Sequence, residues 1–153
     1  MSLNLQGATG ATINFVSGLL AVATSTGLFK TVTNTIVASI KGILVTKAPT
    51  DNIPFTIEPN SGPVVTLPNS FKVVAVGEAC GFSIFMDSSA AITVAQGQSV
   101  GSGDKVNFPA APQDKVMIGA FKVIPTAAFT PGTTALTSVS TFYNLSGHPG
   151  VAI

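Results

Sequence analysis

The sequence predicts an all-β protein, a single compact β-sandwich or β-barrel domain of short antiparallel strands with a glycine-rich N-terminal arm. Short runs rich in β-branched and aromatic residues recur along the chain, separated by clusters of Gly, Pro, Asn, Asp and Ser. No stretch combines the apolar period of a helix with helix caps. The length of 153 residues suits one domain. We place the β domain at residues 31–153, with the arm and a first strand at residues 1–30.

The first thirty residues begin with a small, uncharged stretch, MSLNLQGATGAT. We expect residues 1–12 to be a flexible arm, either free or ordered on a partner. In residues 11–29, polar side chains such as Asn14 and Ser17 interrupt the apolar run, and no Lys or Arg precedes it. The run falls short of the roughly 20 apolar residues that span a bilayer, and it lacks the basic start of a signal peptide. We predict a strand followed by a Gly/Ser/Thr connection.

Residues 31–47 predict the clearest hairpin. Lys41-Gly42 lies between two β-prone runs, and a two-residue turn there pairs Ile40 with Ile43 and Ala38 with Val45. Together with Ile36, these side chains share one apolar face. A slip of one residue would lose that face, so the register is well specified.

The next segment, residues 48–68, contains five prolines, which is too many for a central strand. We predict an extended loop or edge segment that carries Phe55 and Ile57. Residues 71–76 (FKVVAV) follow and predict a buried strand.

A second hairpin is predicted further along the chain. Phe82, Ile84 and Met86 alternate on one face, residues 87–91 form the turn, and Ile92 and Val94 return. Residues 96–104 (QGQSVGSGD) then predict a flexible loop. Its Gly-Ser-Gly is not followed by a helix or by the Lys-Ser/Thr pair of a phosphate-binding P-loop, so we interpret it as a plain connection.

The last third of the chain, residues 108–143, predicts β-structure as well. A turn at residues 109–114 leads into a strand at residues 116–124, which Pro125 closes. Two alternating sets are expected on its two faces: Met117, Gly119, Phe121 and Val123 on one, and Val116, Ile118, Ala120 and Lys122 on the other. Residues 129–136 (FTPGTTAL) predict a turn, because Pro131 fixes its φ and Gly132 is free to take a positive one.

The charge content excludes several classes of partner. Only 8% of residues are charged, against about 25% in an average protein, and the net charge is +1. The chain has no arginine, and its seven lysines are spread without a cluster (Lys30, Lys41, Lys47, Lys72, Lys105, Lys115, Lys122). Nucleic acids and anionic membrane surfaces are both recognised by basic patches, so we expect neither as a partner.

The sequence offers little for catalysis, cofactors or metals. Its one histidine, His148, and its six acids (Asp51, Glu58, Glu78, Asp87, Asp104, Asp114) form no catalytic motif. One His and one Cys cannot complete a tetrahedral zinc site unless copies of His148 meet on a symmetry axis. Cys80 is the only cysteine, so it forms no intrachain disulfide, and we expect a buried side chain. We predict no enzyme activity, no cofactor, and no catalytic or metal-binding residue.

The order of these segments resembles a known family. The phrases IVASIKGILVTKAPT, GFSIFMDSSAAITVAQG and "FP.AP..KV.IGAFKV…AAFTPGTTAL" occur one after another across about residues 31–143. In this order they resemble the capsid decoration, cement or head-fibre-like proteins of tailed bacteriophages. The proline-rich residues 49–68 and the residues past Asn144 depart from the pattern, and the first 30 residues do not match it.

The resemblance implies a structural virion protein that binds the outer surface of an assembled capsid and stabilises it. It further implies a homotrimer that clamps neighbouring subunits of the major capsid protein, made in the host cytoplasm, which suits a chain without disulfides. Residues 1–30 would then contact the capsid or a neighbouring subunit. The alternative is a receptor- or glycan-binding β module of a tail fibre or cell surface, although the chain has no Trp and only one Tyr, Tyr143, to present to a sugar.

Overall fold

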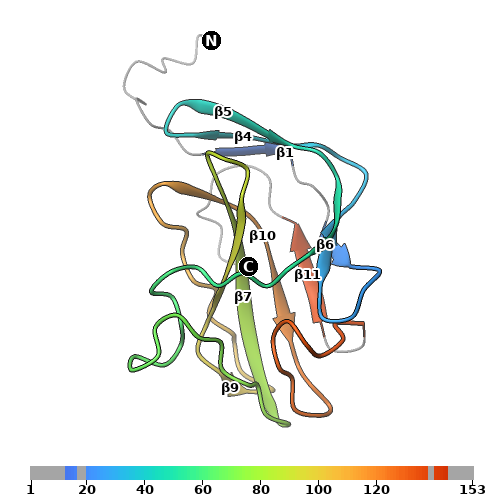
Figure 1. Cartoon of the computed structure of the whole chain (residues 1–153). Helices are drawn as coiled ribbons and strands as arrows, with labels where there is room; N and C mark the ends of the chain where they lie inside the picture. The colour runs from blue at the N-terminus through green and yellow to red at the C-terminus, as the bar shows by residue number, and fades with distance from the viewer. Residues whose placement is uncertain (1–12, 17–19, 138–139, 145–153) are drawn as a thin grey trace.

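A computed structural model describes residues 13–16, 20–137 and 140–144, and confirms the all-β prediction. The described residues contain no helix and form three antiparallel sheets, which pack into a compact sandwich-like domain rather than a closed barrel (Figure 1). The expected arm at residues 1–12 lies outside the described residues. No helix in the described ranges is long and apolar enough to cross a membrane.

The central sheet supplies most of the core. Its strands lie in the order β11, β10, β7, β8, and a short β9 also pairs with β7. They are β7 (Glu78–Asp87), β8 (Ile92–Gln96), β9 (Val100–Gly101), β10 (Lys115–Val123) and β11 (Ser140–Asn144). Eight successive residues of β7, from Ala79 to Met86, are buried, because layers of the molecule cover both faces of this strand.

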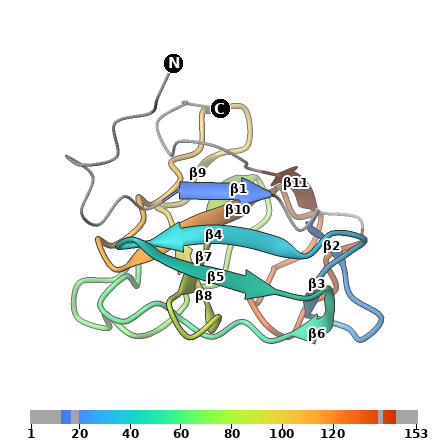
Figure 2. The ribbon, with the colours of Figure 1, turned by 90° about the horizontal axis from the view of Figure 1, so that it is seen from above.

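Two three-stranded sheets pack beside the central one. The first has the order β1, β4, β5 and lies across the upper end of β7 and β10 (Figures 1 and 2). The second has the order β2, β3, β6. Their strands are β1 (Ile13–Val16), β2 (Leu20–Val22), β3 (Phe29–Thr31), β4 (Ile36–Ile40), β5 (Ile43–Lys47) and β6 (Thr50–Ile53).

One contact joins the second small sheet to the far edge of the central sheet. The Leu20 amide of β2 donates a 2.5 Å hydrogen bond to the side-chain carbonyl of Asn144 in β11, 124 residues later in the chain. Residues 11–29 thus contain β1 and β2, where we predicted one strand and a connection.

The first hairpin is confirmed in the predicted register. Ile40 pairs with Ile43, and Ala38 with Val45. Lys41 and Gly42 both have positive φ, 50° and 79°, as a type I′ turn requires. Ile36, Ala38, Ile40 and Val45 are buried as expected, but Ile43 is 58% exposed because it lies at the turn end of an edge strand.

The second hairpin is also confirmed. Met86 pairs with Ile92, and Ile84 with Val94. The Asp87 carboxylate accepts hydrogen bonds from the amides of Ser89 (2.8 Å) and Ala91 (3.0 Å), which fixes the turn. The loop predicted after it contains β9, whose Val100 and Gly101 pair with Ala79 and Glu78.

Strand β10 confirms the predicted strand, but not its simple alternation. A bulge between Met117 and Gly119 shifts the pairing with β7 by one residue. Ile118, Gly119, Ala120 and Phe121 are buried in succession because β10, like β7, is covered on both faces. The turn at residues 129–136 is confirmed: Gly132 has φ 79°, and the amides of Thr133 and Thr134 both donate to the Thr130 carbonyl.

The strand predicted at residues 71–76 is wrong. Only Val74 is fully buried there, through a single bridge to Phe129, while Val73 and Val76 are exposed. An apolar run does not make a strand when no neighbouring strand offers a free edge along its length. The proline-rich segment is confirmed as an edge, because β6 lies at the border of its sheet and Ile57 makes one bridge to Val94.

Phenylalanine rings fill the space between the sheets. Phe82 of β7 and Phe121 of β10 are cross-strand partners, and their rings stack with centroids 4.8 Å apart. Phe55 meets four other rings edge-on or nearly so. The cluster consists of Phe29, Phe55, Phe71, Phe82, Phe121, Phe129 and Phe142. Each aromatic pair adds about 0.5–1.5 kcal/mol beyond the burial of its surface.

The other face of β7 is covered by the segment that leads into β10. This segment crosses so close to Gly81 and Gly97 that a Cβ atom on Gly97 would lie 2.3 Å from the backbone oxygen of Asn107. The Gly97 amide also donates a 2.8 Å hydrogen bond to the Gly81 carbonyl. Both positions therefore need glycine for space rather than for an unusual φ.

We expect Gly97→Ala to lower the free energy of unfolding by about 1–3 kcal/mol, because the added methyl group displaces the Asn107 backbone. Urea unfolding measures the change. Gly103→Ala is the matched control, since a Cβ there meets nothing within 4 Å, and it should stay within about 0.5 kcal/mol of the wild type. Equal stability of Gly97→Ala and the wild type would contradict the close packing.

Candidate functional site

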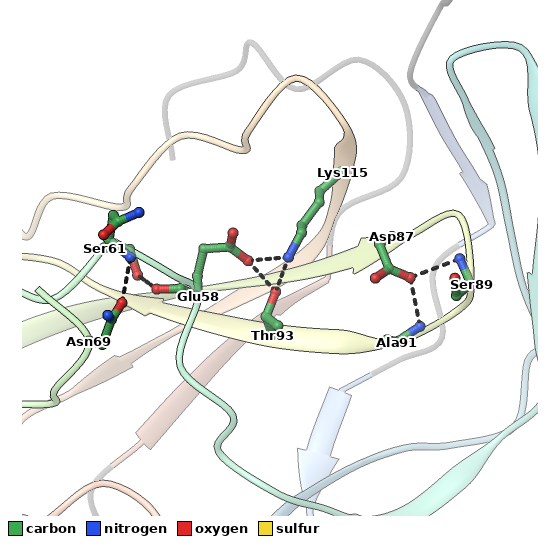
Figure 3. A network of polar contacts seen from close by, with 9 residues as sticks. Glu58, Ser61, Asn69, Asp87, Ser89, Ala91, Thr93 and Lys115 are labelled. Carbon is green, nitrogen blue, oxygen red and sulfur yellow. Dashed lines mark hydrogen bonds and ion pairs between the residues drawn. The ribbon is translucent and has the colours of Figure 1, made fainter.

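A buried ion pair joins two distant segments of the chain. Lys115 Nζ lies 2.6 Å from Glu58 Oε2, and the two side chains are only 12% and 9% exposed. Thr93 Oγ1 donates to the same Glu58 oxygen at 2.5 Å, and Lys115 Nζ donates to Thr93 Oγ1 at 3.2 Å (Figure 3). The three side chains therefore satisfy one another inside the protein, as buried charges require.

Backbone contacts hold Glu58 in this position. The Glu58 amide donates to the Val94 carbonyl, and the Val94 amide donates to the Thr56 carbonyl, each at 2.8 Å. Ile57 thereby runs parallel to β8 and covers its free edge. The ion pair adds a side-chain link from this short segment to the first residue of β10.

Glu58 is also the root of a compact surface loop, residues 59–70, which we call the Val65 loop. The amide and hydroxyl of Ser61 both donate to the Glu58 carbonyl, and the Asn60 amide donates to the Asn69 side chain at 2.8 Å (Figure 3). Higher in the loop, the Gly62 amide donates to the Pro68 carbonyl at 2.7 Å. A loop whose ends are closed by its own hydrogen bonds is an Ω-type loop, a class that is frequently functional.

The Val65 loop presents apolar side chains to solvent. Val65 is 92% exposed and Leu67 is 57% exposed. None of the twelve residues from 59 to 70 is charged, and three are proline. The loop is therefore an uncharged projection with exposed apolar side chains, and its own hydrogen bonds close its base.

A second uncharged apolar surface lies on the sheet of β1, β4 and β5. Because side chains alternate along a strand, the burial of Ala38 and Val45 on the inner side directs Val37 and Leu44 outward. Val16 lies opposite Val37, and the bulge beside it leaves Phe15 53% exposed. We call Phe15, Val16, Val37 and Leu44 the outer sheet face. No charged residue occurs in β1, in β4 or in β5 before Lys47, and the exposed Lys41 lies beyond the strands in the turn between β4 and β5.

Chemically reactive groups are scarce in the described part of the chain. It contains no group of three or more His, Cys, Asp or Glu side chains that could hold a metal ion. His148, the histidine considered as a metal ligand or base, lies outside the described residues. Two acidic side chains near turns accept hydrogen bonds from backbone amides. The Glu78 carboxylate accepts from the Ala75 amide, and the Asp87 carboxylate accepts from the Ser89 amide in its own turn.

Asp51 shows the same use of a carboxylate. It accepts hydrogen bonds from the hydroxyl (2.5 Å) and amide (3.2 Å) of Thr24, and thereby ties β6 to the turn before β3. These hydrogen bonds from Thr24, the hydroxyl bond first, hold the pKa of Asp51 below its ordinary value. The group is fully exposed, so we assign it a local role.

Cys80 is buried, as the sequence predicts. Burial raises the pKa of its thiol to about 11, although its Sγ also contacts the Gly97 carbonyl at 3.3 Å. A protonated, enclosed thiol is neither a nucleophile nor a metal ligand.

Sequence reasoning did not find the two apolar surfaces or the ion pair. Glu58 and Lys115 are 57 residues apart, and no spacing motif connects them. The outward position of Leu44 follows from the hairpin register, which the sequence does predict. The sequence does not show that, among the described residues, no other layer covers that face.

Comparison of the chain with known protein families, with characterised proteins and with solved structures gave no match. The contacts and surfaces described above therefore carry the functional argument.

We expect Glu58→Gln and Lys115→Met each to destabilise the protein by about 3 kcal/mol, because each leaves one buried charge without its partner. The double variant should lose less than the sum of the two, which urea unfolding of all three variants measures. Both single variants should also speed proteolysis within the Val65 loop. Lys122→Met, on the same strand, serves as the control, and additive losses would contradict the coupling.

Cys80 should resist thiol reagents in the folded protein at about pH 8, because the pKa of its thiol is raised and the side chain is enclosed. Reaction with a chromogenic disulfide should follow the rate of unfolding and become immediate in denaturant. Rapid modification of the native protein would show that the site opens locally.

Proposed function

We propose that this protein is a structural virion protein that binds the outer surface of an assembled bacteriophage capsid and stabilises it. The observation that carries the proposal is the exposure of two separate apolar surfaces without charge, the Val65 loop and the outer sheet face. Contiguous exposed apolar side chains mark sites of contact with other proteins. The resemblance to capsid decoration proteins supplies the kind of partner.

The physical effect of such binding is mass action. A protein that binds the assembled lattice and not its free subunits stabilises the lattice by the free energy of its own binding. An oligomer that touches several capsid subunits gains further, because each additional contact forms at a high effective concentration. Activity of this kind needs complementary surfaces and no reactive group.

The glycan- or receptor-binding alternative gains no support from a particular contact. Tyr143 is half-buried, and its ring packs edge-on against Phe108 with centroids 5.6 Å apart. It is therefore engaged within the protein rather than presented as a flat platform for a sugar.

The test uses phage heads that lack the protein. We expect the added protein to sediment with these heads and to raise the temperature at which they release DNA. Because the exposed apolar surfaces carry no charge, binding should change less than about threefold between roughly 0.05 and 0.5 M NaCl, a range that strongly screens ionic contacts.

Binding to host cells but not to heads would overturn the proposal in favour of the receptor module. Strong loss of head binding at the higher salt concentration would contradict the apolar contact. Heads of an unrelated phage provide the control for non-specific adhesion.

A further inference from the structure

We propose that residues 2–6 of this chain pair with the free edge of β5 and add a fourth strand to the sheet of β1, β4 and β5. These residues belong to the arm, residues 1–12, which lies outside the described residues. The inference rests on the backbone groups along β5, on the place where β1 begins and on the sequence of the arm. It goes beyond the proposed function, because the contact holds whether or not the protein binds a capsid.

Strand β5 presents a regular edge that no described residue covers. It pairs with β4 over five consecutive residues without a register shift, and it lies at the border of its sheet (Figure 2). Because Ile40 and Ile43 flank a two-residue turn, they form a hydrogen-bonded pair, and bonded and non-bonded pairs then alternate along the hairpin. The backbone amide and carbonyl groups of Leu44 and Thr46 therefore point away from β4. Another extended backbone satisfies such a row of donors and acceptors.

Three other edge strands of the described sheets are protected in ways that β5 is not. A bulge interrupts the pairing of β1, a register shift and the positive φ of Asn52 (55°) interrupt β6, and Ile57 covers β8. Strand β5 has no bulge and no proline, and its one charged residue, Lys47, stands at its last position. A regular uncharged edge pairs with other chains unless something covers it. A segment of the same chain gives that cover.

The arm joins the sheet close to this edge. Ile13, the first residue of β1, pairs with Ser39, and Ser39 pairs with Leu44. The start of β1 thus lies at the same end of the sheet as the turn between β4 and β5 (Figure 2). Because the arm runs toward this end and β5 runs away from it, the two would be antiparallel.

The length of the arm is sufficient for this path. A strand beyond β5 would lie three strand spacings from β1, which is about 14 Å. The eight residue steps from Leu5 to Ile13 can span roughly 26 Å, enough to pass around the turn as well. Residues 7–12 (GATGAT) are small and uncharged, as a close crossing over the turn requires.

The sequence of the arm fits the edge in one register. Residues 2–6 (SLNLQ) alternate like a strand, with Leu3 and Leu5 on one face. Ile43 is 58% exposed, although it shares the inner side of β5 with the buried Val45. Pairing Leu5 with Ile43 and Leu3 with Val45 covers that exposed side chain. A slip of one residue would turn both leucines outward and leave Ile43 uncovered.

This register leaves the surfaces of the proposed function open. The leucines face inward, so the outer sheet face and the Val65 loop stay accessible. None of residues 1–12 is charged, so the pairing buries no unpaired side-chain charge. The resemblance implies a different place for the arm, on the capsid or on a neighbouring subunit, and the experiment separates these possibilities.

The experiment measures amide hydrogen exchange by nuclear magnetic resonance, in the full-length protein and in a variant that lacks residues 2–10. We expect the amides of Leu44 and Thr46 to exchange at least about tenfold more slowly in the full-length protein, because carbonyl groups of the arm accept their hydrogen bonds. The Val45 amide, which the register directs toward β4, is the internal control and should stay protected in both proteins.

Two substitutions in the full chain provide the matched test. Leu5→Asp should release the amides of Leu44 and Thr46, because it places a charge against Ile43. Ala8→Asp adds the same charge within the connection and should leave both amides protected. Circular dichroism and urea unfolding establish that each variant is folded, and Leu5→Asp replaces the truncated protein if that protein is not.

Four outcomes would overturn the proposal. Fast exchange of Leu44 and Thr46 in the full-length protein would show that the edge is open. Protection that survives both the truncation and Leu5→Asp would assign the edge to another segment. Protection that appears only as the protein concentration rises would assign it to a second copy, and protection that appears only when phage heads are added would assign it to the capsid.

Discussion

The stack of Phe82 on Phe121 is the contact on which the rest of the structure depends. These rings belong to neighbouring central strands, and the stack forms only in the register that pairs the two residues directly. Phe55 packs edge-on against both rings and brings the proline-rich segment onto the sheet. Phe29 packs on Phe55 in turn and brings β3 with it. The aromatic cluster thus positions the central sheet, the sheet of β2, β3 and β6, and the proline-rich segment relative to one another.

The position of the Val65 loop depends on this core. Two residues separate Phe55 from Glu58. The ion pair to Lys115 and the backbone hydrogen bond to Val94 then fix the position of Glu58. The Val65 loop starts at Glu58. The buried ion pair and the backbone hydrogen bonds to Val94 therefore fix the base of the loop, and the apolar tip extends from it. An uncharged loop without such a base would lose more conformational entropy on binding.

Local patterns made the hairpins predictable. Lys41-Gly42 and the Asp87 turn lie between strands that are adjacent in sequence, so turn chemistry and alternation specify the pairing directly. The run at residues 71–76 misled because its apolar residues suit a strand, yet only Val74 finds a partner. The bulge at Met117 and the Glu58–Lys115 pair depend on tertiary neighbours, which no local pattern encodes. The apolar surfaces required knowing which sheet faces remain uncovered, and that is a property of the assembled layers.

The hydrogen bond from Leu20 to Asn144 has a consequence for how this protein is made. It connects residues 124 positions apart. Strand β1 also pairs with β4, and β7 pairs with β10, which is synthesised later. Contacts of such long sequence separation slow folding, since a large loop must close before they form. As the chain leaves the ribosome, the hairpin of β4 and β5 can form early, but β2 cannot complete its contacts until β11 has been synthesised. Until then the apolar strands stay exposed, and we infer that this interval is when the chain is most open to aggregation and to chaperones.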